Sequence, residues 1–417
     1  MARPFIIAIA AAALLPAMAA AQLLPGREAV GRAVPGLLDD LGGALRLDEL
    51  EQLSPTRVAD RLLAVRADRI AALLRGNRDS MAPDDRGNPA VRSSILVTGA
   101  DAAARAAIAK AGYVVAEERI EGLDIAVLHV IVPETEGLAG AIRKVRKLAP
   151  AAEVAGDTLY FASGPAPAVG PGTALAGGVV SGGKVAGLID GGVARHPALT
   201  APVEQRGFAK GAPMASGHGT AVASLIAGAG PIRGAAAGTS LLVADVYGAD
   251  PAGGGALAIA RALGWMVSRR VPVVTISLVG PDNPLLAGAI RIARARGTIV
   301  VAAVGNDGPA APPVFPASYP AVVAVTGVDR RDRVLIEAGR ARHLDFAAPG
   351  ADMMAAGGDG GAIHVRGTSF AAPLVAGRLL AAGSVDALAA QARDLGARGP
   401  DKVYGRGLVC GDCRNSR

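Results

Sequence analysis

Between residues 184 and 382, short apolar runs that suit buried strands alternate with runs that suit helices. The expected strands lie near 185–190, 240–247, 271–278, 297–304, 321–327 and 343–347. The expected helices lie near 218–228, 254–269, 284–296 and 369–382. Such alternation is typical of a parallel sheet that helices cover on both faces. The pattern therefore predicts an α/β fold of three layers with a mostly parallel central sheet.

A serine stands at the start of the last expected helix. Ser369 lies in the run GTSFAAP (367–373), directly ahead of a helical pattern of apolar residues. Backbone N–H groups at a helix N-terminus point outward and favour negative charge. A serine that attacks a carbonyl gains from this position, because the attack leaves an oxyanion. It also needs a base for its proton and a group that orients the base.

Three upstream residues are candidates for those supporting roles. Asp190 ends the first expected strand, His218 opens the first expected helix, and Asn306 follows the fourth strand. Active sites on open parallel sheets collect at the carboxyl ends of the strands. We therefore expect the three side chains to lie close to Ser369.

Four motifs in this order resemble those of the subtilisin-like serine proteases, the subtilases. The motifs are LIDGGV (188–193), HGTAVA (218–223), AVGN (303–306) and GTSFAAP (367–373). The resemblance covers about residues 183–409 and implies a subtilisin-like fold. It also implies a catalytic triad of Asp190, His218 and Ser369, with Asn306 as an oxyanion donor. The expected activity is that of a serine endopeptidase that works through an acyl-enzyme.

Other serine chemistries fit this sequence less well. An α/β-hydrolase would need a Gly-x-Ser-x-Gly turn, and no serine of the chain has that setting. A sedolisin would carry a glutamate in place of His218. The remaining histidines lack comparable settings, and we expect them to be structural: His129, His196, His343 and His364.

The resemblance also implies where a substrate would bind. An extended peptide would pair as an added strand with one edge of the cleft. The implied substrate-binding residues are Ser277, Leu278, Val279, Ala303, Val304 and Gly305. Val279 stands where the family usually has glycine, and Val304 stands where a smaller residue is common. We therefore expect a narrower specificity than that of a digestive protease.

Charge and composition limit the partners. The net charge of +7 is spread along the chain without a dense basic block. The closest cluster lies on the polar face of an expected helix, as Arg143, Lys144, Arg146 and Lys147, and is typical of a solvated surface. We expect a monomer with a protein or peptide substrate and no nucleic-acid partner. Calcium is common in the family, but no acidic loop here suits an ion, so we assign no cofactor and no metal ligands.

The first 21 residues have the pattern of a secretory signal peptide. Arg3 supplies a positive start, residues 5–15 are apolar, and Pro16 precedes small residues that suit cleavage near 17–21. A membrane anchor is the alternative. Export would place the protein in the periplasm or outside the cell. Cys410 and Cys413, in the tail 410–417, could then form a local disulfide or pair with another molecule.

The region between the signal and the protease motifs divides into three segments. Residues 22–91 predict a helix that starts at Ser54-Pro55, followed by a linker with Pro83, Gly87 and Pro89. Residues 92–162 predict a βαββαβ unit with strands 94–98, 113–119, 123–132 and 153–161 and helices 100–111 and 134–148. Residues 163–182 are rich in Gly, Pro and Ala and suit a processing linker.

A ferredoxin-like unit directly before a subtilase domain resembles the inhibitory propeptide of that family. This implies a zymogen whose partner is its own prodomain, although an ordinary extra domain would have the same pattern. Two other functions stay open. One is a secreted protein that binds peptide strands without cutting them, and the other is a permanently inhibited complex that acts as an interaction module.

Overall fold

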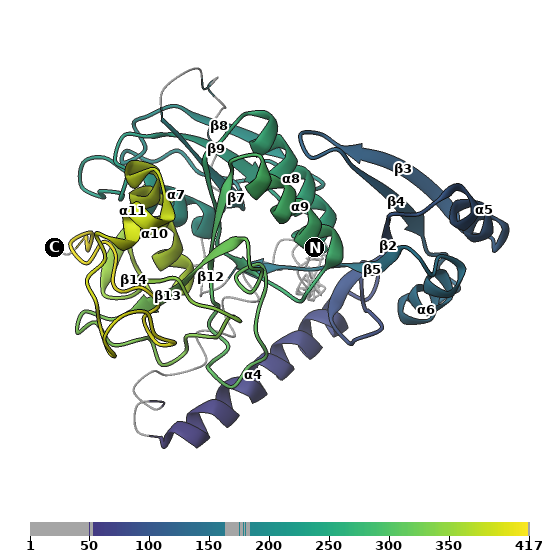
Figure 1. The fold of residues 1–417 in the computed structure, drawn as a ribbon, viewed down its shortest axis with the longest axis horizontal. Helices are drawn as coiled ribbons and strands as arrows, with labels where there is room; N and C mark the ends of the chain where they lie inside the picture. Colours follow the sequence, from purple (N-terminus) through teal and green to yellow (C-terminus); the bar gives the residue numbers. More distant parts are fainter. Residues whose placement is uncertain are drawn as a thin grey trace, which may run out of the picture.

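The computed structural model describes residue 50 and residues 53–162, 175, 178, 180 and 184–415. The predicted signal peptide and nearly all of the predicted linker at 163–182 lie outside these residues. Two units pack together: a small unit, residues 81–158, and a large unit, residues 184–409 (Figure 1). The long helix α4 (Pro55–Gly76) runs along one edge of the molecule.

The large unit is built on a seven-stranded sheet of order β14-β13-β12-β10-β7-β9-β8. Every neighbouring pair in this sheet is parallel. The strands are β7 (Val185–Asp190), β8 (Val203–Gly207), β9 (Ser240–Asp245), β10 (Val273–Ile276), β12 (Ile299–Ala303), β13 (Val322–Val328) and β14 (Phe346–Pro349). The central strands are almost continuously buried, as a sheet covered on both faces requires. The predicted parallel α/β architecture is confirmed.

Helices cover both faces of this sheet and complete the three layers (Figure 1). On one face, α7 (Gly217–Ala227) and α10 (Thr368–Ala382) share an apolar cluster with the strands. On the other face, α8 (Ala256–Ser268) and α9 (Pro284–Ala295) form a second cluster. The small residues of α7, all buried, let it lie close to the sheet and to α10.

Shorter elements complete the large unit. The helix α11 (Val385–Ala389) follows α10, and β15 (Met353–Ala356) pairs with β16 (Ala362–Val365). Within the described residues, no helix combines the length and the apolar character needed to cross a membrane.

The small unit has the strand and helix order βαββαβ. Its elements are β2 (Pro89–Thr98), α5 (Ala102–Lys110), β3 (Val114–Ile120), β4 (Ile125–Ile131), α6 (Leu138–Leu148) and β5 (Glu153–Thr158). The strands lie in the order β5-β2-β4-β3, and all their pairings are antiparallel. Both helices pack on one face, where they form an apolar core of their own.

One sequence interpretation requires correction at the start of this unit. Pro83, Gly87 and Pro89 do not form a linker, because β1 (Met81–Pro83) pairs antiparallel with the first residues of β2. The Asp84 side chain closes the turn between them by accepting hydrogen bonds from the backbone N–H groups of Arg86 and Asn88, both at 2.8 Å. Proline is tolerated there because Pro83 is the last residue of β1 and Pro89 is the first residue of β2.

The small unit docks on α8 and α9 through close backbone approaches and buried polar groups. The β3–β4 turn and α8 approach so closely that a Cβ on Gly122 would overlap the Gly264 carbonyl, and a Cβ on Gly264 would overlap the Glu121 carbonyl. Asp157 at the end of β5 accepts a hydrogen bond from the Leu257 N–H, 3.0 Å away, in the first turn of α8. The Asn283 amide, at the start of α9, donates to the Gly156 carbonyl at 3.0 Å.

Candidate active site

Parallel pairing brings the ends of three neighbouring strands to one edge of the large sheet. Ile276 of β10 lies opposite Ile189 of β7 on one side and opposite Ala302 of β12 on the other. The residues that follow these three therefore share one edge: Asp190, Ser277 and Ala303. This is the carboxyl edge, where open α/β sheets collect their functional groups.

The Asp190 carboxylate and the His218 imidazole form a buried pair at this edge. Nδ1 of His218 lies 3.0 Å from Oδ1 and 2.9 Å from Oδ2 of Asp190. His218 is the second residue of α7, whose start is capped by the Ser216 hydroxyl as it accepts from the Gly219 N–H. A carboxylate against Nδ1 favours the tautomer that carries its proton there, so Nε2 can act as a base.

Ser369 enters the site as the second residue of α10. The ring of its neighbour Phe370 lies 5.4 Å from the His218 ring, between centroids, so the N-terminal ends of α7 and α10 meet here. Ser369 is fully buried, and no hydrogen-bond partner for its Oγ exists within the part of the chain that the structure describes. A buried hydroxyl without an acceptor among those residues is thus held in the helical turn that contacts His218 through Phe370.

Pro373 explains how the backbone at Ser369 is held. In a regular helix the Ser369 carbonyl would accept from the N–H of residue 373, but proline has none. The carbonyl instead accepts a hydrogen bond from the Ser277 hydroxyl at 2.9 Å. Because of Pro373, the Ser369 carbonyl has no helical donor. Ser277, directly after β10, binds this carbonyl and so fixes the position of the serine.

Asn306 lies on a loop beside the start of α10. The chain leaves β12 and turns at Gly305, whose φ of +82° is unfavourable for a residue with a side chain. The Asn306 Oδ1 atom then accepts a hydrogen bond from the Thr368 N–H at 3.0 Å. Because the amide oxygen is held in this way, the amide N–H groups point away from that N–H and can serve as donors to another group.

The predicted substrate edge already carries a strand of this chain. The strand β6 (Phe161–Ala162) pairs antiparallel with β11 (Leu278–Val279). Ala162 lies opposite Leu278, and Phe161 lies opposite Val279. The strand direction points the end of β6 toward Ser277, which contacts Ser369. This pairing has the geometry of a peptide added to a sheet edge.

The residue before this strand anchors it. Tyr160 is fully buried, its ring lies against Gly280, and its hydroxyl donates to the Pro281 carbonyl at 2.7 Å. Burial raises the pKa of Tyr160 well above its ordinary value, so the phenol stays a donor. The Tyr160 carbonyl in turn accepts from the Tyr247 hydroxyl at 2.8 Å. These contacts hold the segment that leads into the cleft.

The structure separates the predicted substrate-binding residues into two groups. Ser277, Leu278, Val279 and Gly305 lie at or beside the edge that β6 occupies. Ala303 and Val304, like Leu278, lie among the core side chains of the sheet, but unlike Leu278 they do not pair with β6. The sheet register explains this, because consecutive residues of a buried strand face the two apolar layers in turn.

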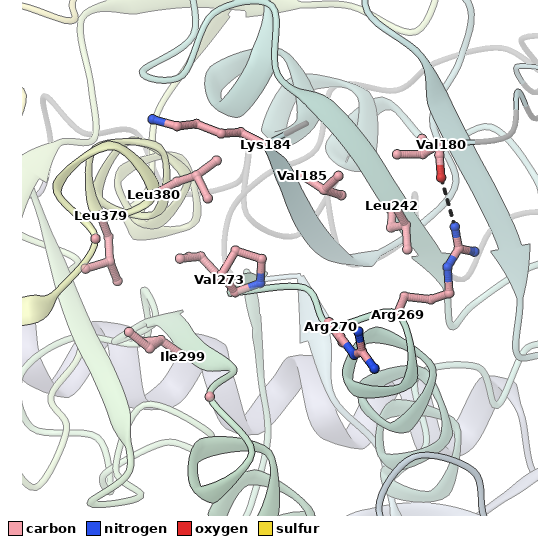
Figure 2. A pocket seen from close by; sticks show the side chains of 13 residues that line it. Val180, Lys184, Val185, Leu242, Arg269, Arg270, Val273, Ile299, Leu379 and Leu380 are labelled. Carbon is pink, nitrogen blue, oxygen red and sulfur yellow. Dashed lines mark hydrogen bonds between the residues drawn. The ribbon is translucent and has the colours of Figure 1, made fainter. Parts of the chain in front are cut away.

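A cavity of about 550 Å³ lies elsewhere (Figure 2). Its lining includes Val185, Val273 and Ile299, which stand at the amino-terminal ends of β7, β10 and β12. It is therefore at the edge of the sheet opposite Asp190 and Ser277. The Asp–His pair and the cleft edge, and not this cavity, define the candidate site.

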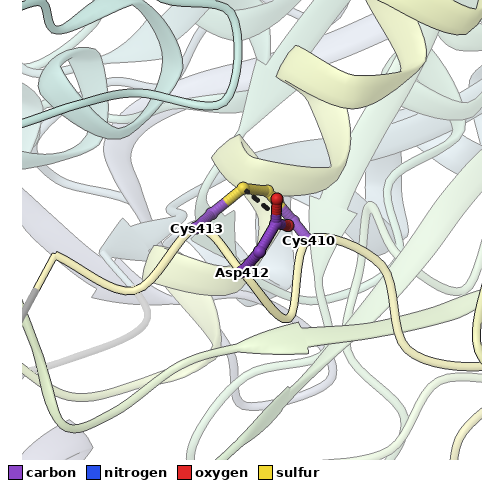
Figure 3. A group of neighbouring side chains, drawn as sticks. All are labelled: Cys410, Asp412 and Cys413. Carbon is purple, nitrogen blue, oxygen red and sulfur yellow. Dashed lines mark hydrogen bonds between the residues drawn. A yellow bond between two sulfur atoms is a disulfide. The ribbon is translucent and has the colours of Figure 1, made fainter.

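Cysteine and histidine side chains outside the site have structural roles. Cys410 and Cys413 form a local disulfide beside Asp412 (Figure 3). These three are the only described group of potential metal ligands that lie together, and the disulfide removes two of them. His196 contacts the Gly361 carbonyl at 3.0 Å, and His343 contacts the Val322 carbonyl at 2.9 Å. His129 contacts the Ser94 hydroxyl at 2.7 Å, and His364 lies in β16 opposite Met354.

Several contributors were absent from the sequence interpretation. The spacing of Ser369 and Pro373 could have revealed the free carbonyl, since both lie in one motif. Tyr160 and β6 carry no local signal for cleft binding, because their partners are more than a hundred residues away. Arg66 and Arg69 share one helix face, yet nothing in the sequence indicates that Asp307 is their partner.

Comparison with known proteins agrees with this geometry. Residues 182–388 match the Peptidase S8 family, described as the subtilase family. The major intracellular serine protease of Bacillus subtilis (strain 168) is 32% identical over 153 residues, which cover 36% of this chain and 48% of that protein. The minor extracellular protease Epr of the same strain is 28% identical over 172 residues, which cover 38% of this chain and 27% of that protein.

A solved structure supports the same fold over a longer region. Fervidolysin from Fervidobacterium pennivorans, described as a keratinolytic enzyme related to subtilisin, has a TM-score of 0.62 and 21% identity. The likeness covers 78% of this chain and 61% of that one. The chain spans about half or less of the length of the curated relatives above. The four motifs and the parallel sheet agree with the match of residues 182–388 to the subtilase family.

Proposed function

We propose that this protein is a serine endopeptidase. The observation that carries the proposal is the Asp190–His218 pair, at 2.9 and 3.0 Å, next to the buried hydroxyl of Ser369 on the adjoining helix. Asp190 holds the imidazole and stabilises its cation, and His218 takes the proton of Ser369 through Nε2. The serine oxygen then attacks a peptide carbonyl and forms an acyl-enzyme.

The negative charge on the attacked oxygen needs donors. The Asn306 amide is turned toward this role because its oxygen is held by the Thr368 N–H. The backbone N–H of Ser369 lies in the first turn of α10, where N–H groups lack helical acceptors. His218 then returns its proton to the leaving amine, and a water molecule, activated by the same base, hydrolyses the acyl-enzyme.

The test compares Ser369→Ala with Ser268→Ala, a control at a serine whose hydroxyl bonds only its own helix, at the Trp265 carbonyl. Both purified chains are assayed for hydrolysis of a fluorogenic peptide library and for labelling by a fluorophosphonate probe. Ser369→Ala should lose both activities, and Ser268→Ala should keep them. Hydrolysis and labelling that persist in Ser369→Ala would refute the assignment.

We further propose that the chain is made as a zymogen whose small unit is its inhibitory prodomain. Three contacts support this: β6 occupies the substrate edge, Asp157 caps α8, and the Gly122–Gly264 approach leaves no gap. An ion pair between Glu118 of β3 and Arg261 of α8 adds to the same interface. The direction of β6, which runs toward Ser277 and Ser369, supports a cut beyond Ala162, in the linker region 163–182.

Mass spectrometry of the purified chain tests this processing. Wild-type protein should yield fragments that separate within 163–182, and Ser369→Ala should stay intact. A wild-type chain that stays intact and hydrolyses no peptide would instead favour a permanently inhibited interaction protein.

We propose that the protein acts outside the cytoplasm, in the periplasm or medium. The apolar N-terminal pattern and the Cys410–Cys413 disulfide support export, since disulfides persist in oxidising compartments. The relatives include an intracellular and an extracellular protease, so kinship alone does not decide. N-terminal sequencing of the Ser369→Ala chain, which should not process itself, should find a start near residues 20–22, whereas a retained Met1 would contradict export.

A further inference from the structure

The helix α4 lies outside the βαββαβ unit but contacts the active-site loop that carries Asn306. Its first half packs on the large unit, where Val58 and Leu62 share an apolar cluster with Ile336. Leu62 lies against Gly308, and a Cβ on this glycine would come within 2.7 Å of the Leu62 Cδ1 atom. Figure 1 shows α4 running along the molecule from this loop region toward the small unit.

Two arginines of α4 bind the residue next to Asn306. Arg66 Nε lies 3.1 Å from one carboxylate oxygen of Asp307, and Arg69 Nη2 lies 2.5 Å from the other. The Asp307 side chain is 11% exposed, and those of the arginines are 31% and 27% exposed. Ion pairs shielded to this degree are screened less than surface pairs, so they resist salt and solvent better.

The second half of α4 covers the strand in the cleft. Leu73 is 1% exposed and clusters with Met81, Leu159 and Phe161, the residue of β6 that faces Val279. A cavity of about 60 Å³ lies between α4 and the cleft wall, with Leu73 of α4 on one side and Phe161 and Val279 on the other. Because β6 pairs with β11 and α4 packs on Phe161, a substrate strand cannot pair with β11 while both are in place.

We infer that α4 is a second inhibitory element, a strap that is tied to Asp307 and keeps β6 against β11. The inference rests on the proposed protease function and concerns how that site is kept closed. The βαββαβ unit contacts the large unit at α8 and α9. The helix α4 contacts it at a different place, the 306–308 loop. Cleavage after Ala162 leaves both contacts intact, so opening the site also requires the departure of α4.

The full chain with Arg66→Gln and Arg69→Gln tests the strap. Glutamine has nearly the same helix propensity as arginine, so the two substitutions remove the charges and should leave α4 helical. The matched control is Arg61→Gln with Arg75→Gln, two exposed arginines of the same helix and the same change in net charge. The measurement is the lag before a freshly purified chain hydrolyses a fluorogenic peptide. We expect the lag to shorten about tenfold, equivalent to ~1.4 kcal/mol, in the first variant only.

A second measurement does not depend on activity. In the Ser369→Ala background, amide hydrogen exchange should quicken over α4 and residues 305–308 in the Arg66/Arg69 variant, with the βαββαβ unit unchanged. Should the double variant fail to fold, Arg69→Gln alone gives the same comparison. A lag and an exchange pattern equal to those of the control would overturn the strap. If no variant hydrolyses any peptide, the proposed protease function is refuted instead. Hydrogen exchange then still tests whether the two arginines hold α4 on the 305–308 loop.

Discussion

Replacing Asp157 with asparagine should change how the stability of the full chain depends on pH. Burial raises the pKa of the Asp157 carboxyl from 3.8 to about 6, because desolvation outweighs the hydrogen bond from Leu257 and the charge of Arg261. The folded state therefore binds this proton more tightly than the unfolded chain does. The resulting contribution to the free energy of unfolding is fully present below pH 3.8 and is lost as the pH rises through about 6.

The size of the effect follows from the same two values. With a pKa of 3.8 unfolded and about 6 folded, the loss is spread across that window and levels off above it. Between about pH 4.5 and 7.5 it amounts to about 2 kcal/mol, at 1.36 kcal/mol for each pKa unit. Asparagine keeps an oxygen that accepts from the Leu257 N–H but carries no proton that titrates here. The variant should therefore lose this part of the pH dependence.

The assay is urea unfolding of the full chain in the Ser369→Ala background, which prevents self-digestion. The chain that retains Asp157 and its Asp157→Asn variant are each measured at about pH 4.5 and 7.5, and the difference between the two proteins is compared across pH. The comparison is needed because His129 acts oppositely: burial and Arg261 lower its pKa, so it favours folding at higher pH. A difference between the proteins that does not change with pH would refute the account of Asp157.

Three further outcomes are expected. Asn306→Ala should lower kcat about 10²–10³-fold with little change in KM, measured on a peptide substrate, because one oxyanion donor is lost; a rise in KM alone would make Asn306 a binding residue. In Val279→Gly, kcat/KM for library peptides with larger side chains should rise relative to the other peptides, by a ratio equivalent to roughly 1–3 kcal/mol, since Val279 lies in the wall opposite Phe161. An unchanged substrate profile would contradict this. Gly264→Ala should shorten the latency of the precursor, because a Cβ there overlaps the β3–β4 turn, whereas Gly288→Ala, whose Cβ meets nothing within 4 Å, should not.

The fold and the site residues could be predicted because their signals are local. The apolar runs that predict β7, β10 and β12 are each continuous in sequence, and the site motifs fall directly after them or at helix starts. The register of a parallel sheet then brings Asp190 and Ser277 to one edge without further information. Helix ends were less certain: the helix expected from residue 134 begins at Leu138, because the chain makes a turn from Pro133 to Glu136.

The contacts that close the cleft could not be predicted, because each joins segments far apart in the chain. Phe161 meets Val279 through backbone pairing, which any residue can make. The burial of Asp157 becomes evident only when the small unit docks on α8, since its neighbours in sequence are polar or small. The partner of Arg66 is 241 residues away, and an arginine on a helix is otherwise typical of a solvated face.

The pairing of β6 with β11 has a consequence for the activity of the proposed zymogen. In the uncut zymogen, β6 is part of the same molecule, so its effective concentration at the cleft is very high and does not depend on dilution. After the cut, the same strand belongs to a separate fragment, and its occupancy follows mass action. At high protein concentration, processed molecules would therefore stay inhibited. Dilution alone would release the fragment and start proteolysis.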